Sequence, residues 1–109
     1  MEVGRGDLVT VVVPGGYGKP RPALIVQSDA FGEIPSLTVL PLTSDLQPTP
    51  LLRITVEPSP ANGLERASQI MIDKAVTVPR AKIGRHVGRL DAALMPEVGS
   101  ALAAFLGLG

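Results

Sequence analysis

The sequence contains no cysteine and no tryptophan, and its only histidine is His86. Without cysteine there are no disulfide bonds and no thiolate metal sites, which suits a reducing cytoplasm. A single histidine argues against a catalytic zinc site. It also excludes a pair of histidines acting as acid and base within one chain. We therefore expect neither a metal ion nor another cofactor.

The sequence also has no net charge, with ten Lys and Arg residues against ten Asp and Glu residues. General nucleic-acid binders are usually basic overall, so any contact with nucleic acid must come from a local patch. The one basic cluster consists of Arg80, Lys82, Arg85 and Arg89, in ten residues without an acid. Such a cluster is usually a solvated face. It is also where an RNA backbone or the acidic tail of a partner protein would bind.

Long hydrophobic runs are absent as well. None approaches the ~20 residues that a membrane-spanning helix needs. Arg5 and Asp7 interrupt the N-terminal segment where a secretion signal would carry its apolar stretch. We therefore expect a cytoplasmic protein without a membrane segment. A length of 109 residues fits a single domain spanning residues 1–109.

Aromatic residues are scarce, and the apolar content is mainly Val, Leu, Ile and Ala. A core rich in β-branched residues is typical of a small barrel or sandwich. Twelve Gly and eleven Pro at short intervals indicate short strands joined by turns, including a turn-rich loop at 14–20. Apolar runs and alternation predict strands at 7–13, 21–28, 37–42, 51–57, 67–73, 75–78 and within 83–87.

Three local features sharpen this prediction. The strand at 21–28 is apolar throughout its middle, so we expect it to be buried on both faces. Pro41 should sit at a sheet edge or at a strand end. A C-terminal helix is expected, starting either after Asp91 as its N-cap or at Pro96. Gly107 should end this helix.

Four sequence blocks carry a resemblance to a known family. They are Gly-Asp-Leu-Val at 6–9, Arg-Pro-Ala-Leu-Ile-Val at 21–26, Pro-Leu-Thr-Ser at 41–44, and Gly-Leu at 63–64 with Ser-Gln-Ile-Met-Ile-Asp at 68–73. In this order they resemble the MazF/PemK toxins of type II toxin–antitoxin systems. The segments 83–84 and 88–90 and the final helix are similar too, so the likeness spans roughly residues 3–106.

The resemblance implies a mainly β fold, a small SH3-like (CcdB/PemK-type) barrel of six or seven short strands with a C-terminal α-helix. It implies a homodimer with an RNA groove along its interface. It further implies a metal-independent, sequence-specific endoribonuclease that cleaves single-stranded RNA by 2′-hydroxyl attack and so inhibits translation and growth. A cognate antitoxin would neutralise it.

Metal-free RNA cleavage must stabilise the extra negative charge on the phosphorus oxygens. Arg21 is the first candidate, because a guanidinium always carries charge and can hold two phosphate oxygens. It stands where a glycine-rich loop enters a buried strand. The alternative is a surface arginine at a strand edge. A guanidinium is a poor proton acceptor, so we assign Arg21 to charge stabilisation and leave proton donation to the leaving oxygen open.

Thr43 and Asp73 complete the predicted catalytic set. The Thr43 hydroxyl would bind a phosphate oxygen or orient the 2′-hydroxyl, unless it serves only local turn chemistry. Asp73 ends the predicted fifth strand, and the resemblance implies a general base there. The alternative is a turn residue paired with Lys74. Met71 departs from the PemK-like branch, which carries an arginine at this position, so either Arg21 or another cation takes that role or the acid–base pair is arranged differently.

Other polar residues are candidate RNA contacts. These are Lys19, Ser44, Arg53, Gln69, Arg80, Lys82 and Arg85. Gln69 would read a base edge or orient Arg21, or else be an ordinary polar residue on a solvated strand face. The basic residues would contact phosphates.

Two other functions remain possible at this point. A CcdB-like gyrase poison shares the fold implied by the resemblance, but such toxins use a C-terminal aromatic segment, and this chain ends in Phe-Leu-Gly-Leu-Gly without tryptophan. A non-catalytic SH3-like module would bind peptides through several exposed aromatics, of which this sequence has few.

Overall fold

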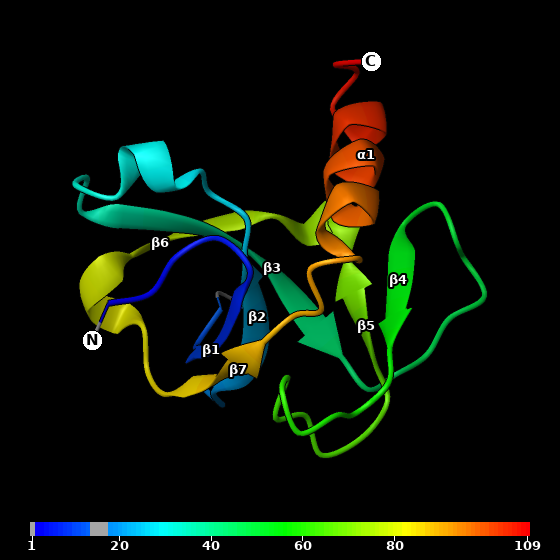
Figure 1. The fold of residues 1–109 in the computed structure, drawn as a ribbon, viewed down its shortest axis with the longest axis horizontal. Coiled ribbons are helices and arrows are strands. Elements are labelled where there is room, and N and C mark those ends of the chain that lie inside the picture. Colours follow the sequence, from blue (N-terminus) through cyan, green and yellow to red (C-terminus); the bar gives the residue numbers. More distant parts are fainter. Residues whose placement is uncertain (1, 14–17) are drawn as a thin grey trace.

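Seven strands and one helix make up the fold of this computed structural model, which describes residues 2–13 and 18–109. The strands are β1 (Asp7–Val11), β2 (Arg21–Ile25), β3 (Ser36–Thr43), β4 (Arg53–Val56), β5 (Ser68–Met71), β6 (Val76–Pro79) and β7 (His86–Arg89), followed by helix α1 (Met95–Phe105). Figure 1 shows α1 standing over one end of the sheet. Residues 14–17 of the predicted loop at 14–20 lie outside the described residues.

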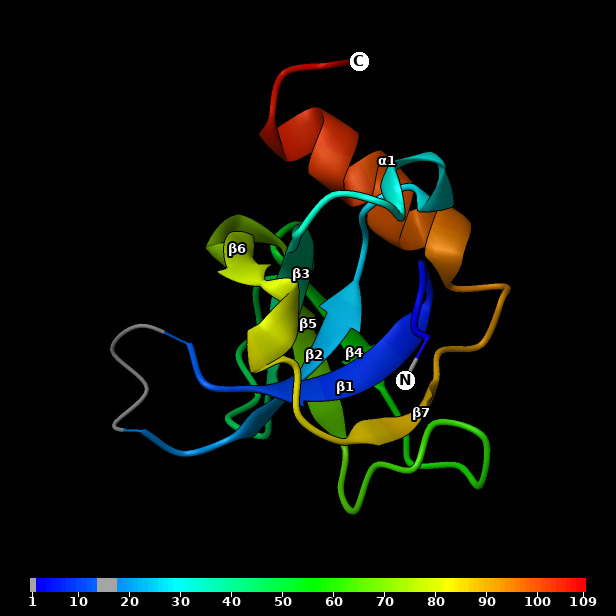
Figure 2. The same ribbon diagram turned by 90° about the vertical axis from the view of Figure 1, so that its left-hand side faces the viewer.

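The strands form one strongly curved antiparallel sheet in the order β4-β5-β3-β2-β1-β7, with β6 added to β3 (Figure 2). The eight-residue β3 holds it together, because its first half pairs with β6 and its end pairs with β5. β2 runs along its other side. The predicted mainly β barrel with six or seven strands and a C-terminal helix is confirmed.

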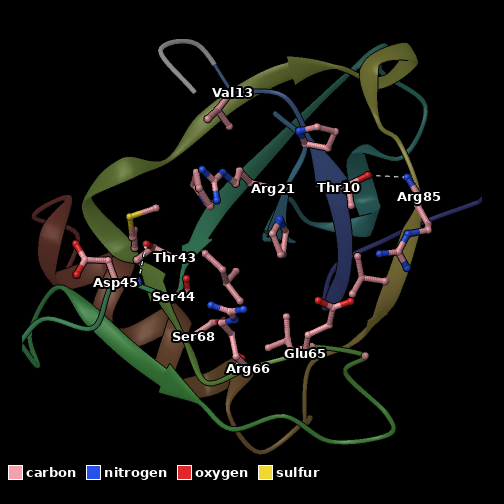
Figure 3. A pocket seen from close by; sticks show the side chains of 18 residues that line it. Thr10, Val13, Arg21, Thr43, Ser44, Asp45, Glu65, Arg66, Ser68 and Arg85 are labelled. Carbon is pink, nitrogen blue, oxygen red and sulfur yellow. Dashed lines mark hydrogen bonds between the residues drawn. The ribbon is translucent and has the colours of Figure 1, made fainter. Parts of the chain in front are cut away.

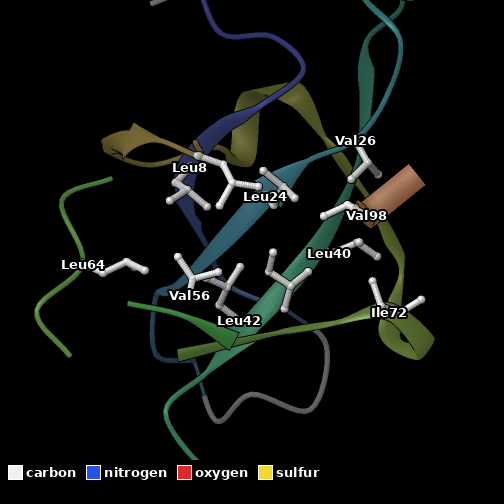
Figure 4. Close-up of a cluster of buried hydrophobic side chains, with 11 residues drawn as sticks. Leu8, Leu24, Val26, Leu40, Leu42, Val56, Leu64, Ile72 and Val98 are labelled. Atoms are coloured by element: carbon white, nitrogen blue, oxygen red, sulfur yellow. The ribbon is translucent and has the colours of Figure 1, made fainter. Parts of the chain in front are cut away.

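The core lies on both faces of the central strands. One cluster, which includes Leu8, Leu24 and Leu40, packs beneath Val98 of α1 (Figure 4). The other contains Val9, Ile25 and Val39, the sequence neighbours of the first three. Neighbouring strand residues point to opposite faces, so β1, β2 and β3 are buried on both sides. The prediction that the second strand is covered on both faces is therefore confirmed.

Pro41 lies inside β3, so the predicted place at an edge or strand end is wrong. It stands opposite Ala23 of β2. The pairing of β3 with β6 ends at Val39, and the pairing with β5 begins at Leu42. A residue without an N–H is tolerated in this gap because the ladder is interrupted there anyway.

The helix begins close to Pro96 and not at a cap by Asp91. α1 starts at Met95, with Pro96 in its first turn. Asp91 instead accepts the Ala93 N–H at 3.0 Å in a separate turn. Gly107, with φ +75°, ends the helix as predicted. No helix in the described part of the chain is long and apolar enough to cross a membrane.

An ion-paired carboxylate fastens the N-terminal segment to β7. The Asp7 carboxylate accepts the Gly4 N–H at 2.8 Å and Arg89 Nη1 at 2.9 Å, and His86 Nε2 lies 3.3 Å away. Burial by itself raises the pKa of Asp7. The hydrogen bonds from Gly4, His86 and Arg89, with the charge of Arg89, more than offset this and lower the pKa below its ordinary value.

This pairing predicts a pH-dependent contribution to stability. Because the folded pKa of Asp7 lies below the unfolded value, its contribution is complete above about pH 4 and is lost as the pH falls through the folded pKa. We expect Asp7→Asn to reduce the free energy of unfolding by about 1 kcal/mol at pH 6, and less towards pH 2. Urea denaturation across this range would measure the difference, with Glu33→Gln as the control. A loss of unfolding free energy in Asp7→Asn that does not change with pH would contradict a role of the charged Asp7 carboxylate in stability.

Candidate active-site cleft

A cleft of about 760 Å³ opens where the ends of β2 and β3 meet the loop at 57–67 and the segment before β7. Its side chains include three arginines, several hydroxyls and two carboxylates (Figure 3). They come from positions 10 to 87 of the chain, so only the curvature of the sheet brings them together. The cleft is therefore a product of the tertiary fold.

Arg21 projects into this cleft from the first position of β2. Its backbone pairs with Val11, and Ala23, Leu24 and Ile25 behind it are fully buried. Within the described residues, no carboxylate lies at ion-pair distance from its exposed guanidinium. Arg21 is therefore a cation whose backbone is held in the sheet and whose charge is available to a ligand.

Thr43 lines the same cleft from the last position of β3. Its Oγ1 accepts the Asp45 N–H at 3.1 Å, which is the local turn chemistry expected of a threonine at a strand end. An accepting hydroxyl keeps its own proton for donation. Thr43 can therefore stabilise the turn and still donate to a phosphate oxygen. Ser44, which is exposed where Thr43 is half-buried, lies beside it in the cleft.

Asp73 does not line this cleft, and its predicted place at the end of a strand is wrong. β5 ends at Met71, and residues Ile72–Lys74 form a 3₁₀ turn that packs against α1. Asp73 pairs with Lys74 at 3.4 Å, while its Oδ1 is buried without a partner among the described residues. Met71 does face the cleft. A catalytic role for Asp73 stays a prediction that this single chain does not support by proximity.

Gln69 is buried, and its side-chain amide is fully hydrogen-bonded, so the alternative of a polar residue on a solvated strand face is wrong. The predicted contact with RNA stays a prediction. Only 6% of Gln69 is exposed. Its Oε1 accepts the Gln47 N–H at 2.9 Å, and its Nε2 donates to the Gln47 carbonyl and to Thr55 Oγ1, both at 3.1 Å. This amide fastens the loop after β3 to the sheet. It does not line the cleft.

The basic residues predicted to contact RNA lie in different places on the fold. Arg85 lines the cleft, where its N–H donates to Thr10 Oγ1 at 2.8 Å. Arg80 lies at a separate hollow, and its Nε donates to the Ile34 carbonyl at 3.1 Å. The other predicted contacts, Lys19, Arg53 and Lys82, do not line the cleft. Their contact with RNA stays a prediction.

Three charged residues of the cleft escaped the sequence analysis, namely Asp45, Glu65 and Arg66. Glu65 and Arg66 directly follow the Gly-Leu block at 63–64, and Asp45 follows the Pro-Leu-Thr-Ser block at 41–44. Proximity to these blocks is the signal that would have found them. With them, the cleft combines cations for phosphate oxygens, hydroxyls that donate, and carboxylates that accept protons or hydrogen bonds.

Comparisons with known proteins identify the family of this chain. A family model for the PemK-like, MazF-like toxin of type II toxin–antitoxin systems matches residues 4–106. The probable endoribonuclease MazF of Mycolicibacterium smegmatis is 49% identical over 105 residues, covering 95% of this chain and 96% of that protein. The endoribonuclease EndoA of Bacillus subtilis is 28% identical, covering 99% of this chain and 97% of its own.

Solved structures show the same fold. The Mycobacterium tuberculosis toxin MazF-mt6 superposes with a TM-score of 0.80 at 24% identity, covering 96% of this chain and 99% of its own. A mycobacterial endoribonuclease solved with its cognate antitoxin also gives 0.80, at 25% identity, covering 98% of this chain and 97% of its own. The family model, the relatives and the fold agree over nearly the whole chain, and the protein belongs to the PemK-like, MazF-like toxins of type II toxin–antitoxin systems.

Proposed function

We propose that this protein is an endoribonuclease toxin that cleaves single-stranded RNA at the cleft containing Arg21 and Thr43. The observation that carries the proposal is the Arg21 guanidinium, which has no ion-pair partner among the described residues and shares the cleft with the Thr43 hydroxyl. The relatives named as endoribonucleases support it. As a member of this family, the chain acts in the cytoplasm as a homodimer, and a cognate antitoxin blocks it. A structural neighbour, a mycobacterial endoribonuclease, was solved in complex with its cognate antitoxin.

In the proposed reaction, the ribose 2′-oxygen attacks the adjacent phosphorus and the bond from phosphorus to the 5′-oxygen breaks. The 2′-hydroxyl gives its proton to a base, and the leaving 5′-oxygen takes up a proton from that protonated base or from water. The products are a 2′,3′-cyclic phosphate and a 5′-hydroxyl end. Arg21 stabilises the charge that develops on the phosphoryl oxygens. Thr43 donates a hydrogen bond to one of them and so orients the phosphate for in-line attack.

Proton transfer in this reaction needs a base for the 2′-hydroxyl. The family resemblance implies this role for Asp73, which lies outside the cleft of its own chain. Asp45 and Glu65 are the carboxylates that line it. Asp45 accepts hydrogen bonds from Gln47 Nε2 at 3.2 Å, and among the described residues Glu65 has no hydrogen-bond partner. Substitution of each of the three by its amide, with the pH profile of cleavage as the readout, would assign the base.

The function is tested with purified protein and naked RNA in the presence of EDTA. We expect endonucleolytic cleavage that leaves 5′-hydroxyl ends, detected by end-mapping of the fragments. An Arg21→Ala protein purified in parallel controls for contaminating ribonucleases. Intact RNA together with trapped gyrase–DNA complexes would instead support the gyrase poison, and intact RNA alone would also overturn the proposal.

Loss of the Thr43 hydroxyl should reduce catalysis without affecting the fold. We expect Thr43→Ala to lower kcat by about 10²-fold, as for removal of one donor to a developing oxyanion. Thr43→Ser keeps the hydroxyl and should retain most of the activity. Single-turnover cleavage of one RNA by both variants measures the contrast. Equal activity of Thr43→Ala and the unmodified protein would show that the hydroxyl serves only the turn at Asp45.

A further inference from the structure

Besides Arg21 and Arg85, the cleft holds a third arginine, Arg66, on the side opposite Arg21. Figure 3 shows the two side chains entering the cleft from different walls, with Thr43 and Ser44 between them. Arg66 is exposed, and within the described residues no carboxylate lies at ion-pair distance from it. Neither the family description nor the names of the relatives assign it a role.

A buried asparagine organises the loop that carries Arg66. Only 4% of Asn62 is exposed. Its Oδ1 accepts the N–H groups of Ser59 and Leu64, both at 3.0 Å, and its Nδ2 donates to the Glu57 carbonyl at 2.8 Å. The Asn62 side chain thus supplies hydrogen-bond partners to loop backbone groups that have no neighbouring strand to pair with. These hydrogen bonds restrain the loop at 57–67 from Glu57 to Leu64.

The residues on either side of Arg66 are fixed as well. Leu64 is buried in the core, and Ser68 is buried at the start of β5, where its Oγ donates to the Arg66 carbonyl at 3.0 Å. The Ala61 carbonyl also accepts the Arg89 N–H at 2.8 Å, which fastens the loop to β7. A long cationic side chain on such a fixed base loses less conformational freedom when it binds a ligand than one on a mobile loop.

On the basis of the proposed function, we propose that Arg66 binds the phosphate next to the scissile phosphate in the RNA chain. Arg21 and Thr43 hold the scissile group, and a cleft of about 760 Å³ leaves room for its neighbour. A guanidinium suits a phosphodiester because it offers two parallel N–H donors.

The carboxylates of the cleft favour RNA over an acidic peptide as the ligand of Arg66. Glu65 and Asp45 line the same cleft, and they would repel the carboxylates of an acidic segment. Nucleobases carry N–H donors that carboxylates accept. A ligand with alternating phosphates and bases therefore satisfies both kinds of charge, whereas an acidic peptide satisfies only the arginines.

Binding of a non-cleavable RNA tests the proposal without relying on catalysis. We expect Arg66→Gln to weaken binding of a 2′-O-methyl uridine dodecamer by about tenfold. The slope of log Kd against log salt should fall by about 0.7, the value for one phosphate contact with a single strand. Arg66→Lys should restore the slope. Arg5→Gln removes the same charge outside the cleft, where the Arg5 side chain donates to the Val26 carbonyl, and should leave the slope unchanged.

A neutral phosphate analogue identifies the phosphate that Arg66 contacts. A methylphosphonate would be placed one nucleotide to the 5′ or the 3′ side of the mapped cleavage site. At one position we expect the analogue and Arg66→Gln each to lower kcat/KM by about tenfold, and the combination to lower it no further. Independent losses at both positions, or an unchanged salt slope with binding of an acidic peptide impaired, would overturn the proposal. Binding that depends on Arg66 without any cleavage would instead refute only the nuclease function.

Discussion

Replacing Arg21 by alanine is expected to abolish RNA cleavage, with a loss of about 10³-fold or more in kcat. Its guanidinium enters the cleft beside Thr43, and no carboxylate among the described residues neutralises it. An alanine leaves the developing charge on the phosphoryl group without its nearest cation. Single-turnover cleavage of an RNA with a mapped site would measure the loss.

The fold should survive this substitution, which separates catalysis from stability. Arg21 is exposed, and the buried residues of β2 begin at Ala23. We expect the free energy of unfolding to change by less than about 0.5 kcal/mol, as for other surface positions. Arg21→Lys tests geometry against charge, because lysine keeps the charge but lacks the paired donors. A folded Arg21→Ala protein that cleaves at the normal rate would refute the proposed site.

Replacing Gly63 by alanine is expected to destabilise the protein by about 3 kcal/mol, because strain and a backbone clash act together. Gly63 has φ +68°, and a Cβ built there would lie 2.1 Å from the Val87 carbonyl oxygen and 3.1 Å from its carbon. The obstacle is the backbone of the neighbouring segment, which cannot rotate away. The loop at 57–67 must therefore separate from β7. For a domain of this size the loss corresponds to roughly 10–20 °C in Tm.

A matched glycine separates the two causes. Gly107 has φ +75°, and a Cβ there would meet nothing within 4 Å. Gly107→Ala should therefore cost only about 1 kcal/mol, the conformational part of the effect. The Gly63→Ala protein should also cleave RNA poorly at temperatures where it remains folded, since Leu64, Glu65 and Arg66 move with the loop. Urea denaturation and cleavage of both variants give the comparison, and equal stability losses would show that the clash is relieved.

The two predictions act on opposite sides of one cleft. Arg21 is the terminal residue of a strand and can be removed without disturbing the core. Gly63 has no side chain to contribute, yet it determines where the loop side of the cleft lies. Asn62 and Gly88 form part of the same close backbone contact between the loop and β7, because a Cβ on Gly88 would lie 2.4 Å from the Asn62 carbonyl. Substitution of a catalytic side chain should therefore lower cleavage without lowering stability, whereas substitution of a structural glycine should lower stability.

Much of the fold was determined by local sequence pattern. The apolar run at 23–26 predicts a strand covered on both faces, and Ala23, Leu24 and Ile25 are fully buried. Gly107 ends the C-terminal helix because only a residue that accepts a positive φ closes a helix in this way. The resemblance of the blocks at 21–26 and 41–44 led to Arg21 and Thr43, which meet in the cleft. These features depend on neighbours in the chain.

Only the tertiary structure decided which charges share the cleft and which do not. It placed Asp73 in a turn beneath α1, buried the Gln69 amide against Gln47, and brought Arg66 to the wall opposite Arg21. Each outcome depends on how strands distant in sequence curve around one another and where a loop is fastened. Strand periodicity predicts the face on which a residue lies. Strand periodicity does not predict which residues of other elements pack against that face, because the packing between elements determines them.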